Sequence, residues 1–478
     1  MRFLLKKYLI FFILAIIVPK VINASNICIS NIYIEGNKKT KANIILRELP
    51  FKVGSIMSSE QLSTYITRAQ ENLTNTSLFN YINIYPEEDT TIANEPIYPN
   101  QEVIVENYSI KIIVEERWYF WPVCNIKLEE RNINSWIHKG DLNRITYDLG
   151  LTIYNVTGRN HKLGIRGSFG FEKGFNLSYN NILLGNSGKH LMGLKAYSLF
   201  NKTLNVYSLD NKPIYIKSSN GFLYKNHGGN ISYTYRQTIR TSHSAIFGYD
   251  KSIIKDTVLK INPGYWGIKG RRSHTFTLTY RLNIEGRDYN VYPTKGYYVN
   301  AECLFGNVND FDFIYWKLKL NTQYYFQLSE RWFWGSALKF AATLKNKEAY
   351  IYDRALGYDN VNMTGYDLYV ADGQYYSIVN NNIKFLIMPK KVFTLNFLRC
   401  LSKFYKIHFT IYGKLNLDAG YVHNKYNSIG NKMENKMLIG SGIGIDVVSY
   451  YDTVISISYA INKFGEHGFY FGITAPII

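Results

Sequence analysis

Apolar and polar side chains alternate with a period of two through most of the C-terminal three quarters of the chain. The clearest stretch spans residues 405–418, where Ile407 and Phe409 alternate with Lys406 and His408. Successive side chains of a strand point to opposite faces, so this period predicts β-strands. Long strands that carry charge on one face and apolar groups on the other are typical of a transmembrane β-barrel with a polar lumen.

The length of this alternating region sets the expected size of the barrel. Residues 123–478 leave room for about sixteen antiparallel strands, at roughly 10 residues per tilted strand plus turns and loops. The pattern itself gives seven strands up to Tyr249, four between His274 and Leu344, and five after a long loop. The expected fold is therefore mainly β, with a small α+β domain preceding the barrel.

The first residues have the organisation of a secretory signal peptide. Arg2, Lys6 and Lys7 precede an apolar run, and a small residue, Ala24, marks the expected cleavage site. The run is shorter than the ~20 residues that a spanning helix needs. We assign residues 1–24 to the signal and expect an exported protein.

Residues 25–122 predict a small α+β module. A strand at residues 29–35 is followed by two helices, the second of which begins with a capping box, Ser58 and Gln61. Two further strands are expected at residues 79–85 and 109–116. Strand, helix, helix, strand, strand in fewer than 100 residues is a compact two-layer unit.

A long polar stretch interrupts the strand pattern at residues 354–385. It contains two Gly-Tyr pairs and Asp372-Gly373 in place of the Ser and Pro of a solvated linker. Compact folds rarely contain such long connections unless the loop is functional or disordered. We expect a loop that folds into the barrel, at residues 346–376, and we interpret Asp372-Gly373 as a turn.

The net charge and the aromatic content indicate which kinds of partner the protein is expected to meet. The formal net charge is +19 and aromatic residues make up 16% of the chain. Aromatic residues at this density suit the girdles at a membrane interface, although AT-rich coding explains part of the excess. An exported basic protein is expected to meet anionic lipid head groups, and we predict no nucleic-acid partner.

No pattern of catalytic, metal-binding or cofactor-binding residues stands out. The cysteines are single, the nine histidines do not cluster at ligand spacing, and no Ser/His/Asp set is recognisable. Gly440, Gly442 and Gly444 precede a strand and no helix, which excludes a dinucleotide loop; such glycines let a barrel wall bend. We therefore predict a protein that is not an enzyme and has no cofactor.

Several segments resemble the bacterial surface antigen family, the BamA/TamA-like outer-membrane assembly factors. The N-terminal module is similar to a polypeptide-transport-associated (POTRA) domain, and its exit EERWYFWPV is similar to the junction with the barrel in that family. The turn at residues 287–296, the long loop, the segment NLDAG at 416–420 and the closing segment at 461–478 carry the rest of the likeness. The resemblance covers residues 25–478 and implies an outer-membrane barrel with its POTRA domain in the periplasm.

The resemblance also implies a site inside the barrel. In the family, an Arg-Gly-Phe/Tyr loop tip meets an aspartate on the inner wall. Here the tip falls on Thr364, Gly365 and Tyr366, and the wall residues are Asp418 and Gly420. Threonine stands in place of the arginine, so either Arg354 substitutes from the base of the loop or weaker bonds hold the loop.

Three classes of function follow from these observations. The first is an outer-membrane factor that helps β-barrel proteins to insert, or exported chains to cross, with unfolded client proteins, periplasmic chaperones and accessory lipoproteins as partners. It would template client strands at a weak seam between the first and last barrel strands, which contain Cys124, Ile126, Gly472 and Pro476. The second is a two-partner-type pore that exports a dedicated polypeptide. The third, less favoured, is an outer-membrane enzyme.

Overall fold

The computed structural model describes residues 26–89, 105–128, 145–170, 172–185, 187–359, 361–396, 406–426 and 430–474. The predicted signal peptide lies outside these ranges. The chain divides into two compact units. One comprises Met1–Gly36, Leu49–Gln70 and Ile82–Val114, and the other comprises Asn37–Glu48, Glu71–Tyr81 and Glu115–Ile478.

The N-terminal module is a four-stranded sheet with two helices. The sheet order is β2-β1-β4-β3, with β1 antiparallel to β2 and parallel to β4. The elements are β1 (Asn26–Glu35), α2 (Ala42–Leu46), β2 (Ile56–Ser58), α3 (Ser59–Asn75), β3 (Phe79–Glu88) and β4 (Val105–Glu116). The predicted capping box is confirmed, because Ser58 N donates to Gln61 Oε1 at 3.1 Å and Gln61 N donates to Ser58 Oγ at 3.2 Å.

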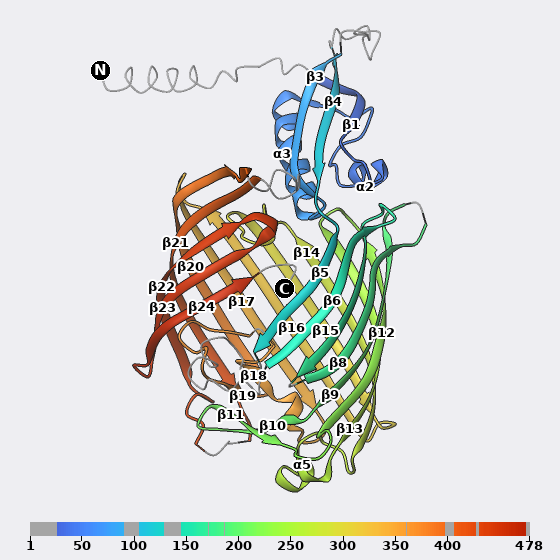
Figure 1. Ribbon diagram of the computed structural model, residues 1–478. Helices are drawn as coiled ribbons and strands as arrows, with labels where there is room; N and C mark the ends of the chain where they lie inside the picture. Colours follow the sequence, from blue (N-terminus) through green and yellow to red (C-terminus); the bar gives the residue numbers. More distant parts are fainter. Residues whose placement is uncertain are drawn as a thin grey trace, which may run out of the picture. The chain divides into compact units, whose positions relative to one another are not determined.

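The remaining long strands form one sixteen-stranded sheet, in which each strand pairs antiparallel with the next barrel strand along the chain. Figure 1 shows this sheet curling into a barrel. The first eight strands are β5 (Phe120–Leu128), β6 (Ile145–Val156), β7 (His161–Gly170), β8 (Glu172–Leu183), β9 (His190–Asn201), β12 (Tyr224–Arg236), β13 (Thr241–Ile254) and β14 (Arg272–Glu285). The other eight are β15 (Gly296–Val308), β16 (Phe313–Gln327), β17 (Trp332–Lys345), β20 (Tyr375–Thr394), β21 (Lys406–His423), β22 (Met437–Ser449), β23 (Val454–Asn462) and β24 (His467–Thr474).

The predicted division of the strands is confirmed: seven strands precede α5, four follow before the long loop, and five come after it. Two boundaries differ. The first barrel strand begins at Phe120, before the expected start near Cys124. Residues 375–385, which we expected in the long loop, form the first half of β20. Three consecutive asparagines, Asn380 to Asn382, place polar side chains on both faces there and obscure the alternation.

Burial on the barrel is inverted relative to a soluble protein. On β21 and β22, the apolar Leu417 and Ile443 are 57% and 61% exposed on the outer face, whereas Asp418 and Asp446 are buried. An apolar outer surface with a polar interior suits strands that face lipid. Within the described ranges, no helix has the length and apolar character needed to cross a membrane.

Smaller elements gather at one end of the barrel, where Figure 1 shows the hairpin β10–β11 beside α5. They are β10 (Thr203–Leu209), β11 (Lys212–Lys217) and α5 (Asp256–Ile261). Buried side chains of Leu204, Val206 and Val258 pack there with Tyr265 and Phe313. The long loop adds η2 (Tyr350–Tyr352) and the hairpin β18 (Arg354–Leu356) with β19 (Ala371–Asp372), and a short η4 (Tyr450–Asp452) precedes β23.

Candidate functional site: the long loop, the barrel seam and a polar cavity

The long loop leaves β17 after Lys345 and packs against the inner side of the wall. Its residues Met363 and Tyr366 are buried in one apolar cluster with Ile378, Val422 and Leu438 of strands β20, β21 and β22. Burying these groups removes apolar surface from water, which stabilises the folded loop. The segment is therefore part of the packed interior.

The tip of the loop meets Asp418 through its backbone. The amide of Thr364 donates to Asp418 Oδ2 at 2.8 Å. The same carboxylate accepts from Asn380 Nδ2 at 2.9 Å and from the amide of Asn381 at 3.3 Å. Three N–H donors to one buried carboxylate satisfy most of its acceptor capacity. The structure thus brings together Thr364 and Asp418, the two positions that the resemblance paired.

Glycines on both sides make this close approach possible. A Cβ atom on Gly440 would lie 1.9 Å from the carbonyl oxygen of Thr364, and one on Gly420 would lie 3.0 Å from Met363 Sδ. Gly365 adopts φ +80°, which side chains other than glycine rarely accept. We expected Gly440 to let the barrel wall bend. In the structure, its lack of a side chain leaves room for the loop tip.

Tyr366 and Gly365 extend the contact to the neighbouring strands. The Tyr366 hydroxyl donates to Ile439 O at 3.0 Å and accepts from Ile439 N at 3.3 Å. Asn462 Nδ2 donates to Gly365 O at 2.9 Å. All three predicted tip residues therefore bond directly to strands β21, β22 and β23, within four strands of one end of the sheet.

That end of the sheet is β24, and the other end is β5. Among strand pairings of described residues, none joins β24 to β5. Of the predicted seam residues, Cys124 is exposed on β5 and Gly472 is exposed on β24. Ile126 lies in β5, and Pro476 falls outside the described residues.

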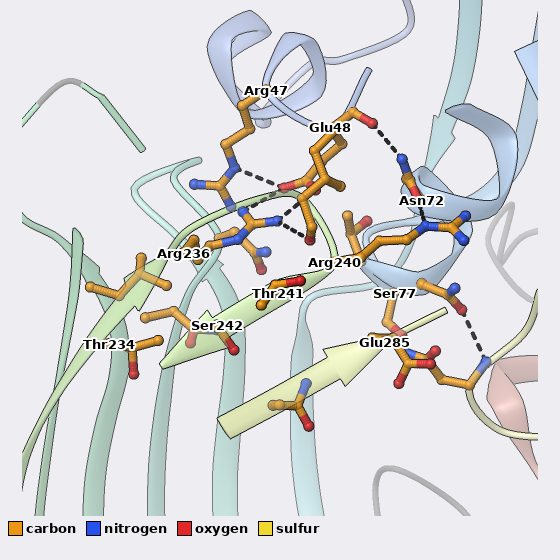
Figure 2. A pocket seen from close by; sticks show the side chains of 18 of the residues that line it. Arg47, Glu48, Asn72, Ser77, Thr234, Arg236, Arg240, Thr241, Ser242 and Glu285 are labelled. Carbon is orange, nitrogen blue, oxygen red and sulfur yellow. Dashed lines mark hydrogen bonds and ion pairs between the residues drawn. The ribbon is translucent and has the colours of Figure 1, made fainter. Parts of the chain in front are cut away.

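A polar cavity of about 470 Å³ is lined by residues 47–48 and 72–77 and by residues of the turns after β12 and β14. Figure 2 shows Arg47 and Arg236 turned toward Glu48. Arg236 holds Glu48 through two bonds of 2.9 and 2.8 Å, Arg47 Nε reaches the same carboxylate at 2.9 Å, and Arg240 pairs with Glu71 at 2.9 Å. These arginines are committed to carboxylates of the protein, so the cavity is chiefly a structural junction.

Comparison with family models decides the classification. The model described as Omp85 superfamily domain matches residues 155–475, and the model described as surface antigen variable number repeat, a POTRA model, matches residues 27–117.

The chain belongs to the Omp85 superfamily.

Solved structures agree with this fold. The Omp85 chain is similar to BamA from Haemophilus ducreyi lacking POTRA domains 1–3, at 16% identity and a TM-score of 0.51, over 93% of this chain and 84% of that one. It is also similar to CdiB from Escherichia coli, at 11% identity and a TM-score of 0.52, over 93% of this chain and 76% of that one. A search of curated proteins finds no match.

Arg354 does not replace the arginine that this Omp85 chain lacks at its loop tip. Its guanidinium lies over the rings of Tyr350 and Tyr358, at 5.9 and 5.5 Å from their centroids. It belongs to the base of the loop, directly opposite Asp372 in the β18–β19 hairpin. Of the two alternatives, substitution by Arg354 or weaker bonds, the structure shows the second. The tip is held to Asp418 by the main-chain amide of Thr364.

A second polar cluster in the Omp85 loop was missed by the sequence reading. Asp372 is buried in β19, where it accepts a hydrogen bond from Ser208 of β10. Its amide donates to Glu434 at 3.4 Å, and Asn431 Nδ2 reaches both Glu434 Oε1, at 2.9 Å, and Ser208 Oγ, at 2.8 Å. The expected turn at Asp372-Gly373 is therefore wrong, because Asp372 joins three chain segments that lie far apart in sequence.

Burial and the nearby charge of Glu434 raise the pKa of Asp372 to about 7, against the opposing effects of Ser208 and Arg354. An Asp-Gly pair is a common turn signal, and nothing local distinguishes it from this use. Ser208 and Glu434 contact Asp372 only in the folded chain, so the local sequence gives no indication of them.

Proposed function

We propose that this outer-membrane Omp85 protein assists the insertion of β-barrel proteins, or the passage of exported chains, by pairing client strands at the β5–β24 seam. The supporting observation is that no described pairing closes the sheet between these two strands. Unpaired strand edges present N–H and C=O groups that an incoming strand can bond. The mechanism needs no catalytic residue, and we propose a non-enzymatic role.

The N-terminal module supplies a second place for clients in this proposal. Its sheet ends at β2, which has three residues, and at β3, which has ten. We assign this module to the periplasm, where β3 is long enough to take an added strand from an unfolded client. Periplasmic chaperones and accessory lipoproteins are the proposed helpers, and the net charge of +19 favours anionic lipid around the barrel.

The long loop also supports an alternative function, that of an export pore. A loop that packs inside the barrel and bonds to three strands is also what a plugged export pore needs, so a two-partner-type transporter for one dedicated polypeptide is the second candidate.

The experiment that separates the two is depletion of this protein in its own cell, followed by quantification of all barrel proteins in the membrane fraction. A broad fall in unrelated barrels supports assembly. Normal barrels together with one secreted protein trapped in the periplasm would overturn assembly in favour of dedicated export.

A further inference from the structure

A buried ion pair connects the two sides of the break in the barrel sheet. Arg117 lies three residues before β5 begins, and Asp452 lies in η4, between β22 and β23. The pair is bidentate, with Arg117 Nη1 at 2.5 Å from Asp452 Oδ2 and Arg117 Nη2 at 3.1 Å from Oδ1. The side chains are only 12% and 4% exposed. The ion pair therefore links the chain entering β5 to the strands beside β24.

Tyr451 adds a second connection between the same two segments. Its hydroxyl accepts a hydrogen bond from the amide of Trp118 at 3.2 Å. Its ring packs edge to face with Trp121 of β5, with centroids 4.8 Å apart. Aromatic pairs in this arrangement attract each other beyond the area they bury. Both the Arg117–Asp452 ion pair and the Tyr451–Trp121 ring contact would have to break if β5 moved away from η4.

The backbone that presents these groups is strained. Tyr451 and Asp452 have φ values of 53° and 61°, in the left-handed region that residues other than glycine rarely adopt. Such conformations persist where surrounding contacts compensate for them, and they cluster at switch regions. Loss of the contacts to Arg117 and Trp118 would leave the turn free to relax to an ordinary conformation.

Asp452 is also tied to the loop between β14 and β15. The Tyr289 hydroxyl donates to Asp452 Oδ1. In the same loop, Tyr292 donates to Asp446 at 2.9 Å, and Pro293 O accepts from Lys384 Nζ at 3.0 Å. One carboxylate therefore connects the entry to β5 with a loop that is bonded to β20 and β22.

We propose that Arg117, Tyr451 and Asp452 form a latch that limits the separation of β5 from β24 across the unpaired seam, and that breaking the ion pair is the step that admits a client strand. This inference rests on the proposed strand pairing at the seam. A bidentate pair makes its full interaction in one geometry only, so a small movement of β5 breaks both bonds together. The latch thus favours two discrete states over gradual widening.

The test is a distance measurement across the seam in the purified full-length protein. Cys124 on β5 is exposed and takes one spin label, and Ile473→Cys on β24 provides the second. Cys28→Ser, Cys303→Ser and Cys400→Ser remove the other thiols. Double electron–electron resonance then gives the populations of short and long distances. A heat-dependent shift in electrophoretic mobility verifies that each variant is a folded barrel.

Arg117→Gln and Asp452→Asn are each expected to increase the long-distance population about tenfold or more, since each leaves an unpaired buried charge. Arg117→Lys, which keeps the charge and loses the fork, should give an intermediate value. The exchange Arg117→Asp with Asp452→Arg should restore much of the short distance. The matched control is the exposed pair Arg271–Asp256, 3.3 Å apart, whose variants Arg271→Gln and Asp256→Asn should change nothing.

An unchanged distance distribution in folded Arg117→Gln and Asp452→Asn proteins would overturn the latch. The measurement needs no client, so this outcome leaves the depletion experiment to decide the assembly function separately. If the variants lengthen the seam distance but depletion leaves other barrel proteins unchanged, the assembly function is overturned and the latch stands.

Discussion

The amide nitrogen of Thr364 donates to the Asp418 carboxylate at 2.8 Å, so a main-chain group occupies the position where the family resemblance implied an arginine side chain. Removing the carboxylate and removing the threonine side chain should therefore differ greatly. Asp418→Ala removes the acceptor of three donors, two of them backbone amides, and should cost about 1–3 kcal/mol for each donor left buried and unsatisfied.

Thr364→Ala is the matched variant, because it keeps the amide and should change loop stability by less than about 0.5 kcal/mol. Hydrogen exchange of residues 361–374 measures both effects. Equal protection in the two variants would contradict the backbone contact.

Gly440 should be intolerant of the smallest side chain. Gly440→Ala places a Cβ atom 1.9 Å from Thr364 O, so the loop tip must leave the wall. We expect protease cleavage within residues 354–374 to become at least about tenfold faster, since local opening exposes the backbone. Gly413→Ala on β21 is the control, because its Cβ atom would meet only the flexible end of Ile387 at 3.4 Å.

Asp372 should make loop stability depend on pH near neutrality. Its pKa in the folded protein is about 7, above the ordinary value near 4, because of burial and Glu434. The folded state therefore retains a proton that the unfolded loop releases, so stability is highest below about pH 4 and decreases as pH rises to about 7.

Asp372→Asn should flatten this dependence and increase loop protection at pH 8. The charges that face Asp372 are Arg354, Glu434 and Asp353, all retained in this variant. The measurement is hydrogen exchange of β18 and β19 at pH 5.5 and pH 8. A pH dependence that survives the substitution would assign the titration to another group.

The Arg117–Asp452 pair should respond to pH in the opposite sense and in a different range. Burial alone raises the pKa of Asp452, but the hydrogen bonds and charge of Arg117 outweigh it and bring the pKa below its ordinary value. Stability from this pair is then fully present above about pH 4 and is lost as pH falls through the lowered pKa. The seam distance should be constant from pH 8 to pH 5 and should lengthen only under stronger acid. An opening near pH 6 would require a different titrating group.

The sequence predicted the barrel because period-two alternation recurs in most of its strands and can be recognised without knowledge of the tertiary structure. The capping box of α3 was equally local, since Ser58 and Gln61 are three residues apart. The first half of β20 was assigned to the loop because three consecutive asparagines, Asn380 to Asn382, place polar side chains on both of its faces. Strand pattern thus fails where both faces are polar.

The site was predicted less completely, for a physical reason. The family resemblance paired Asp418 with the loop tip. The donor in this hydrogen bond is a main-chain amide, which every residue except proline has, so no residue type in the sequence indicates the bond. Each of Asp372, Asp452 and Arg117 has a hydrogen-bond partner 163 to 335 residues away. These partners are Ser208, Tyr289 and Asp452, respectively. Contacts over such separations depend on how the whole sheet curls, and they leave no local signal in the sequence.

The amide contact at position 364 has a consequence for how such chains diverge. Because the donor is a main-chain amide, amino acids other than proline can occupy this position without loss of the contact. The contact instead requires the absence of a side chain at Gly440 and the carboxylate of Asp418. A family search built on the arginine of the loop tip would pass over members such as this one, whereas a search for the paired glycine and aspartate on adjacent strands would retain them.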